Sequence, residues 1–420
     1  MSRDVAIIFG LKVLAVGLNA LGLAALASAS SVAAFGAFAA LFSAGMLISI
    51  PAMAGLNLSL VRHTSGAGPG RLALARHGLG RLAGGLAAAG VLGGVVLLLA
   101  MREAAAGPLA ALLFGLTYGF SEVLQSTARA FDGPVRAFVW REIAWRAAFF
   151  LTALAAALAG GLPAPAMLGL LTLALLLVTA LQARLSALWP LRAPRVAEAG
   201  RLWRHAPGFM GVSLLSTAAQ HLVVLLAGVT LSLEAAAYFF AALKVVQILS
   251  LSVVAVNFVL TTHLRDFRKG KTGETDTKTL TAICATAAWG NLLFWGAGMA
   301  ALLVFGRLIL SLFGAAYESG GVYLAILGVA AGLNAGTGPA GFVLVMFDRQ
   351  RQFNLVSALA ASGGAGLCLL LGGAFGLVGF CWGYVCWIGL QNTGAAWMAW
   401  RTLGINPTAL ARPDWRLLRR

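Results

Sequence analysis

The sequence predicts an all-α integral membrane protein of about twelve transmembrane helices, arranged as two pseudo-symmetric six-helix halves. The composition and the lengths of the apolar segments carry this prediction. Hydrophobic residues fill 60% of the 420 positions, charged residues only 10%, and the mean hydropathy is +0.90. A soluble chain of this length needs more charge to cover its surface. Apolar segments also recur at lengths near the ~20 residues that cross a hydrocarbon layer of ~30 Å.

Each span is placed on an apolar segment bounded by polar residues or turn formers. The first span contains Lys12 and lacks a convincing cleavage site, so we interpret it as a retained helix. Abundant glycine (52 residues) is typical of helices that pack closely in lipid. The predicted spans are 5–27, 32–58, 78–101, 108–130, 137–160, 164–187, 208–231, 234–262, 280–304, 320–346, 354–374 and 377–400.

The loops alternate between strongly basic and nearly uncharged. The loops after even-numbered spans and the C-terminal segment carry most cations, whereas the other loops carry Arg102 and Arg307. Because cytoplasmic loops retain Lys and Arg, we expect an even number of spans with both termini in the cytoplasm. The net charge of +17 therefore indicates membrane topology and not a nucleic-acid surface.

An internal repeat predicts how the spans divide. Segment 33–41 recurs as 235–243, and Phe-Asp ends both span four (131–132) and span ten (347–348). Six spans return the chain to its starting side, so the halves would be related by an axis along the membrane normal. The predicted organisation is an N-terminal bundle 1–188, a cytoplasmic linker 189–207, a C-terminal bundle 208–402 and a basic cytoplasmic tail 403–420.

No motif predicts catalytic, metal or cofactor chemistry. Gly270-Lys271-Thr272 is similar to the end of a phosphate-binding loop, but Arg265 stands where the earlier glycine is required. The five histidines show no pair at metal-binding spacing, and the four cysteines lie in apolar segments. We therefore expect no catalytic residue, no metal and no cofactor.

Two ionisable residues inside spans are the main candidates for function, because charge in lipid normally faces a cavity or a partner. Lys244 lies too deep in span eight for easy snorkelling. It can bind pyrophosphate as a point charge, or form an ion pair with Glu122 of span four. Glu122 in turn can carry a coupling proton, oppose Lys244, or pair locally.

Other polar residues keep two interpretations each. His221 can titrate during transport or hold helices together by a hydrogen bond. Arg146 follows Glu142 by four residues, so it can pair there as an interfacial anchor or bind substrate near the entrance. Arg129 can guard the cytoplasmic mouth or enforce topology. Gln247, Asn291 and Asn334 can bind sugars or clasp neighbouring helices.

Span ten carries a glycine stripe and a helix-bending pair. Gly328, Gly332 and Gly336 recur every four residues, which permits close approach of another helix. Gly338-Pro339 should bend the span. The stripe is consistent with static packing, or with a helix that bends when a cavity changes sides.

Several segments together resemble a known transporter family. The segments are 35–38, 55–56 and 61–62 in the N-terminal half, and 312–317, 353–354, 375–379, Arg401 and 404–407 in the C-terminal half. Their order is similar to that of polysaccharide flippases, the O-antigen branch of the multidrug/oligosaccharidyl-lipid/polysaccharide exporter superfamily.

The resemblance implies a flippase that moves a polyprenyl-pyrophosphate-linked oligosaccharide to the periplasmic leaflet of the bacterial inner membrane by alternating access. The glycan would be an O-antigen, capsule or exopolysaccharide repeat unit. The implied partners are this lipid-linked glycan, membrane lipids, a polysaccharide polymerase and glycosyltransferases, with no nucleic acid. The resemblance also implies a basic residue in span eight, which Lys244 matches.

Three alternatives stay open. A cation-coupled multidrug exporter of the same superfamily would want acidic residues inside the N-terminal half, where Glu122 is the best placed. A polysaccharide polymerase or ligase usually needs a sizeable periplasmic loop, and the predicted loops on that side are short. A lipid II flippase usually carries two more spans.

Overall fold

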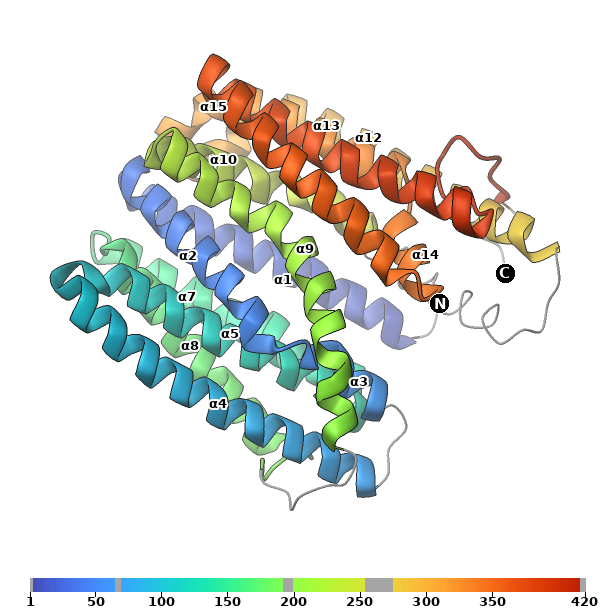
Figure 1. Ribbon diagram of the computed structural model, residues 1–420. Coiled ribbons are helices and arrows are strands. Elements are labelled where there is room, and N and C mark those ends of the chain that lie inside the picture. The colour runs from blue at the N-terminus through green and yellow to red at the C-terminus, as the bar shows by residue number, and fades with distance from the viewer. Residues whose placement is uncertain (1–2, 65–68, 192–198, 254–274, 416–420) are drawn as a thin grey trace. The chain divides into compact units, whose positions relative to one another are not determined.

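The computed structural model describes residues 3–64, 69–191, 199–253 and 275–415, and every regular element in these ranges is a helix (Figure 1). Internal contacts divide the chain into two compact units, Met1–Gly228 and Val229–Arg420. Each unit is described below by itself.

The helices of the first unit are α1 (Arg3–Ser28), α2 (Val32–Met53), α3 (Leu56–Thr64), α4 (Pro69–Met101), α5 (Ala106–Phe131), α6 (Pro134–Phe138), α7 (Trp145–Leu158), α8 (Ala164–Leu185) and α9 (Ala199–Thr230). The helix α5 packs against α2, α4 and α8 (Figure 1). The helices of the second unit are α10 (Leu233–Val246), α12 (Thr275–Ser311), α13 (Gly321–Gly336), α14 (Ala340–Met346) and α15 (Gln350–Leu403).

The described residues account for twelve membrane spans. Nine helices among them are long and apolar enough to cross a bilayer. A tenth span is the uninterrupted helical run 134–158, in which a π-helical turn joins α6 to α7. An eleventh is α9, whose apolar part is Ala219–Thr230. The twelfth arises because α15 is two helices that meet at Phe375 and Gly376, whose backbone is not helical. The predicted fold class is confirmed.

Several helices extend beyond the predicted spans. The helix α4 begins at Pro69 where the sequence predicts a span from 78, and α12 covers Thr275–Ser311 where the prediction is 280–304. Hydropathy marks only the part of a helix that lies in hydrocarbon, whereas backbone hydrogen bonding continues into the interface. In span two the helix is instead shorter than the predicted span 32–58. The helix α2 ends at Met53, and Ala54 and Gly55, which have left-handed backbone conformations, separate it from α3.

The first turns of α9 pack within the first unit. Leu202 and Ala206 are buried in a cluster with Leu56 and Leu60, and the Ser59 hydroxyl donates to the Leu202 carbonyl at 2.8 Å. The sequence assigned residues 189–207 to a linker and 208 onward to the second half. Part of that segment, 192–198, lies outside the described residues, and the predicted linker stays a prediction. The two compact units of the structure divide after Gly228.

Loop cations that predict topology also hold the end of α8 and the residues that follow it. Arg136 donates to the carbonyl of Leu185, the last residue of α8, at 3.1 Å. The last carbonyls of a helix lack intrahelical donors, and this guanidinium satisfies one of them. Arg76 donates from its Nη2 atom to the carbonyls of Ala187 and Trp189, just after the helix, at 2.9 and 2.7 Å.

In the second unit, the glycine stripe of span ten receives large side chains from α12. A Cβ atom on Gly332 would lie 2.7 Å from the Trp295 ring, and one on Gly328 would meet Met299. The Trp295 indole N–H donates to the Gly328 carbonyl at 2.8 Å. The helix then ends at Gly336 and resumes at Ala340, with Gly338 at φ +67° and Pro339 between them.

The predicted basic tail is partly a packed strap. Residues 404–414 follow α15, and Ile405 is buried with Leu280 and Val343. The Ala409 N–H donates to the Gly336 carbonyl at 2.9 Å, and the Asp414 N–H donates to the Thr286 hydroxyl at 2.9 Å. The strap therefore satisfies a carbonyl that the interruption of the helix before Pro339 leaves without its usual donor.

Candidate functional site

A cluster of five charged side chains lies inside the first unit. Lys12 comes from α1, Glu122 from α5, Arg141 and Glu142 from the π-helical turn Val139–Ala144, and Arg146 from α7. The side chains of Arg141 and Glu142 are 7% and 6% exposed, whereas those of Lys12, Glu122 and Arg146 are 28%, 25% and 19% exposed. The charged groups of Arg141 and Glu142 are thus enclosed, whereas the other three charged side chains are partly exposed.

Glu142 is the hub of the cluster. Its Oε2 atom lies 3.4 Å from Lys12 Nζ and 3.1 Å from Arg146 Nη2, and its Oε1 atom lies 3.6 Å from Arg141 Nη1. Arg141 Nη1 also lies 2.6 Å from Glu122 Oε2. Among the described residues the cluster joins three cations to two carboxylates, which leaves one excess positive charge.

Arg141 and Glu142 are neighbours in a π-helical turn. The Trp145 N–H bonds to the Trp140 carbonyl, five residues back, which widens the turn. Both side chains are buried. Such turns are rare and occur frequently at functional sites.

Aromatic and amide side chains enclose Arg141. Its Cζ atom lies 4.5 Å from the centre of the Tyr118 ring, and Tyr118 meets Trp145 edge to face at 5.9 Å. The Gln125 Oε1 atom accepts from Arg141 Nη1 at 2.9 Å. Lys12 lies over the Phe138 ring at 5.4 Å. The guanidinium is therefore held by two carboxylates, an amide and an aromatic face.

Several buried donors at this cluster have no partner among the described residues. They are Arg141 Nε, Arg146 Nε, Gln125 Nε2 and Trp145 Nε1. Buried polar groups are normally hydrogen-bonded, so an unmet donor marks a place where an acceptor fits. Excess positive charge together with unmet donors suits an anionic or strongly hydrogen-bond-accepting ligand.

The structure brings together four of the residues that the sequence singles out. Glu122 and Arg146 belong to the charge cluster of the first unit, and Lys244 and Gln247 are in contact in the second unit. Glu122 and Arg146 are linked through Arg141 and Glu142. Lys244 Nζ donates to Gln247 Oε1 at 3.2 Å, where α10 gives way to a 3-10 turn, and it lies 5.1 Å from the centre of the Phe240 ring. The described partner of Glu122 is thus Arg141.

The remaining sequence candidates have these surroundings within their own units. His221 is buried in the first unit, with Nδ1 3.4 Å from the Ser43 hydroxyl oxygen. Arg129 is exposed at the end of α5. Asn334 lies in α13, where its carbonyl accepts from the Thr337 hydroxyl at 3.3 Å. Gly338 and Pro339 form the interruption between α13 and α14.

Sequence reasoning missed the centre of the cluster. The loop-charge pattern gives Arg141 no role in a site, and helical spacing predicts for Glu142 only a pairing with Arg146. Lys12 was noted inside span one without a role. The available signal was the presence of two opposite charges at 141 and 142 within a predicted span, but their partners on α1 and α5 are distant in sequence.

Solved structures share this fold. A multidrug resistance MATE family transporter of the MOP superfamily, in an inward-facing conformation, aligns with a TM-score of 0.66 at 12% identity, over 95% of this chain and 98% of that one. The lipid II flippase MurJ, in an inward closed conformation, aligns with a TM-score of 0.68 at 11% identity, over 94% of this chain and 87% of that one. The chain has the fold of the MOP superfamily transporters.

A third structure of this fold comes from Pyrococcus furiosus, with a TM-score of 0.55 at 12% identity, over 94% of this chain and 96% of that one. The binding pocket of that transporter has a reversed polarity, which suggests a different function for it. No protein-family model and no curated protein sequence matches this chain. The chain is thus a multi-pass membrane protein whose transporter fold is supported by structure and not by sequence identity.

Proposed function

We propose that this chain is a flippase that moves a polyprenyl-pyrophosphate-linked oligosaccharide across the bacterial inner membrane by alternating access. The cargo would be a repeat unit of O-antigen, capsule or exopolysaccharide. The observation that carries the proposal is the buried cluster of the first unit, with its excess positive charge and unmet donors. Pyrophosphate is an anion rich in acceptor oxygens, which matches both properties.

Each half would contribute cations to the cargo. Arg146 is the most accessible arginine of the cluster that also has an unmet donor, and Lys244 supplies a cation in the second unit. Arg129 would attract the anion at the cytoplasmic mouth, while Gln247 and Asn334 would bond the sugar. With the cytoplasm negative, outward movement of an anion gains ~2.3 kcal/mol per charge per 100 mV, so the membrane potential would assist export.

The replacement Lys244→Ala tests the proposal. In vesicles that contain the purified protein and a labelled polyprenyl-pyrophosphate disaccharide, we expect the rate of flipping to fall about tenfold or more, because a cation that binds phosphate is lost. Lys244→Arg should keep most of the rate. Lys278→Ala, which removes an exposed lysine of the same unit, is the matched control. Unchanged flipping by Lys244→Ala would refute the role of Lys244.

A cation-coupled multidrug exporter is the second candidate, favoured by the structural likeness to MATE transporters and by the two carboxylates inside the first unit. Both carboxylates are already paired with cations, which weakens their attraction for a cationic drug. The same vesicles distinguish the candidates. Accumulation of a cationic dye, with no flipping of the pyrophosphate-linked disaccharide, would favour the exporter.

The proposal also includes an orientation. Loop charge predicts that both termini are cytoplasmic, so a reporter active only in the cytoplasm should be active when fused after Arg420. A reporter active only in the periplasm should be silent at that position and active when inserted at Gly160-Gly161, between α7 and α8. The opposite pattern would overturn the orientation and the direction of export.

A further inference from the structure

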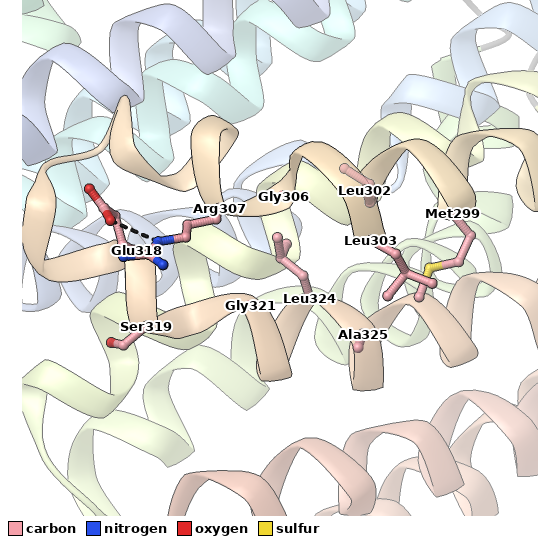
Figure 2. A pocket seen from close by; sticks show the side chains of 10 residues that line it. All are labelled: Met299, Leu302, Leu303, Gly306, Arg307, Glu318, Ser319, Gly321, Leu324 and Ala325. Carbon is pink, nitrogen blue, oxygen red and sulfur yellow. Dashed lines mark hydrogen bonds and ion pairs between the residues drawn. The ribbon is translucent and has the colours of Figure 1, made fainter.

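The second unit contains a groove of about 270 Å³ between the end of α12 and the start of α13 (Figure 2). Its two ends differ in character. Arg307, Glu318 and Ser319 lie at one end, and Met299, Leu303 and Ala325 lie at the other, with Leu324 between them. The groove is therefore amphipathic along its length.

The groove opens on an apolar face of α12. Leu303 is 65% exposed, and the adjacent Val304 and Leu308 are 72% and 66% exposed. Apolar side chains on the surface of a membrane-spanning helix are those that contact lipid. A hydrocarbon chain can thus enter the groove from the side without crossing polar surface.

The polar end carries both signs of charge. Arg307 Nε donates to Glu318 Oε2 at 3.0 Å, while the Arg307 side chain is 81% exposed and that of Glu318 is 33% exposed. Among the described residues, no bond engages the two Nη groups of Arg307 or the Oε1 atom of Glu318. The pair therefore offers donors for a phosphate and, beside them, an acceptor for an ammonium.

Arg307 is also unusual in its position among the loops of the chain. It is one of two cations in the loops that are otherwise nearly uncharged, so orientation does not explain it. Its position near the end of α12 places the guanidinium at the level where phospholipid headgroups lie.

We propose that this groove binds one phospholipid whose zwitterionic headgroup carries a primary ammonium, as in phosphatidylethanolamine. The phosphate bonds the Nη groups of Arg307, the ammonium bonds Glu318, and the start of one acyl chain lies along Leu324 and Leu303. The site is separate from the charge cluster of the first unit and does not depend on the identity of the cargo.

Native mass spectrometry of the purified protein, with phosphatidylethanolamine, phosphatidylglycerol and phosphatidylcholine of equal chain length, tests the site. We expect phosphatidylethanolamine to be retained about fivefold better than the other two, as an interfacial charge contact would give. Arg307→Gln should lower retention of every lipid. Glu318→Gln should remove the preference for phosphatidylethanolamine but keep binding. Both side chains are at the surface, so these variants should fold.

Filling the groove gives a second, independent measurement. A Cβ atom on Gly321 meets nothing within 4 Å, so Gly321→Leu has room for the first atom of its side chain beside the groove. The rest of the leucine side chain would take up groove volume and should lower phosphatidylethanolamine retention about tenfold. Gly363→Leu, on an exposed and equally open position of α15, is the control. Equal retention of the three lipids by the unaltered protein, or displacement of phosphatidylethanolamine by a polyprenyl phosphate, would overturn the proposal.

Discussion

Replacing Arg141 with glutamine is expected to lower the free energy of unfolding by about 3–5 kcal/mol, because it leaves Glu122 without its described partner and removes one of the cations around Glu142. Breaking a buried ion pair on one side costs more than the pair itself contributes, since a charge remains in a poorly solvated place. The measurement is unfolding of the detergent-purified protein in a titration with a denaturing detergent.

The double variant Arg141→Gln with Glu122→Gln separates the pair from other effects. It removes both charges at once, so it should recover more than half of the lost stability. Arg129→Gln is the matched control, because it removes an exposed arginine from the same helix as Glu122 and should change stability little. A double variant as unstable as Arg141→Gln would mean that the loss arises from packing against Tyr118 and not from the uncompensated carboxylate.

Replacing Gly383 with leucine is expected to prevent normal folding of the second unit. The two halves of α15 pack as a hairpin, in which a Cβ atom on Gly383 would lie 2.5 Å from the Cα atom and 2.6 Å from the backbone nitrogen of Cys368. These are backbone atoms, so no side-chain rotation relieves the clash and the helices must separate. The cost should be about 3 kcal/mol or more, at the upper end of overpacking effects.

The same helix offers the control for this experiment. A Cβ atom on Gly373 meets nothing within 4 Å, and the position is exposed. Gly373→Leu should therefore leave stability unchanged or raise it slightly, because leucine favours helix more than glycine does. The measurement is the monodisperse fraction in size-exclusion chromatography together with thermal unfolding. Equal behaviour of the two variants would show that the hairpin tolerates separation at Gly383.

The spans were predictable because the bilayer imposes a length and a polarity on each of them. The break at Phe375-Gly376, for instance, falls between predicted spans 354–374 and 377–400. The starts of α4 and α9 were not predictable from hydropathy, because those turns are polar and lie beyond the hydrocarbon. The packing of Leu202 and Ala206 shows that the start of α9 belongs with the helices of the first unit. Such contacts between distant residues belong to the tertiary structure and cannot be read from hydropathy.

The charge cluster was predictable only in part. Charged residues inside predicted spans, such as Glu122 and Arg146, can be recognised in the sequence because a charge in lipid is energetically unfavourable. Their partners cannot be recognised in this way, since Lys12 and Glu142 are brought together by the packing of α1 against the helical run that contains α7. The π-helical turn that contains both Arg141 and Glu142 has no sequence signal that hydropathy or periodicity detects.

The arginine contacts at and just after the end of α8 imply that two selective pressures act on the same residues. Orientation in the membrane requires only a positive charge, which lysine supplies as well as arginine. The position of Arg76 demands more, because one guanidinium nitrogen reaches the carbonyls of both Ala187 and Trp189. A planar, forked donor makes such a contact and a flexible ammonium does not hold it as well. Evolutionary drift between arginine and lysine should therefore be restricted at position 76 and free at cations that serve orientation only.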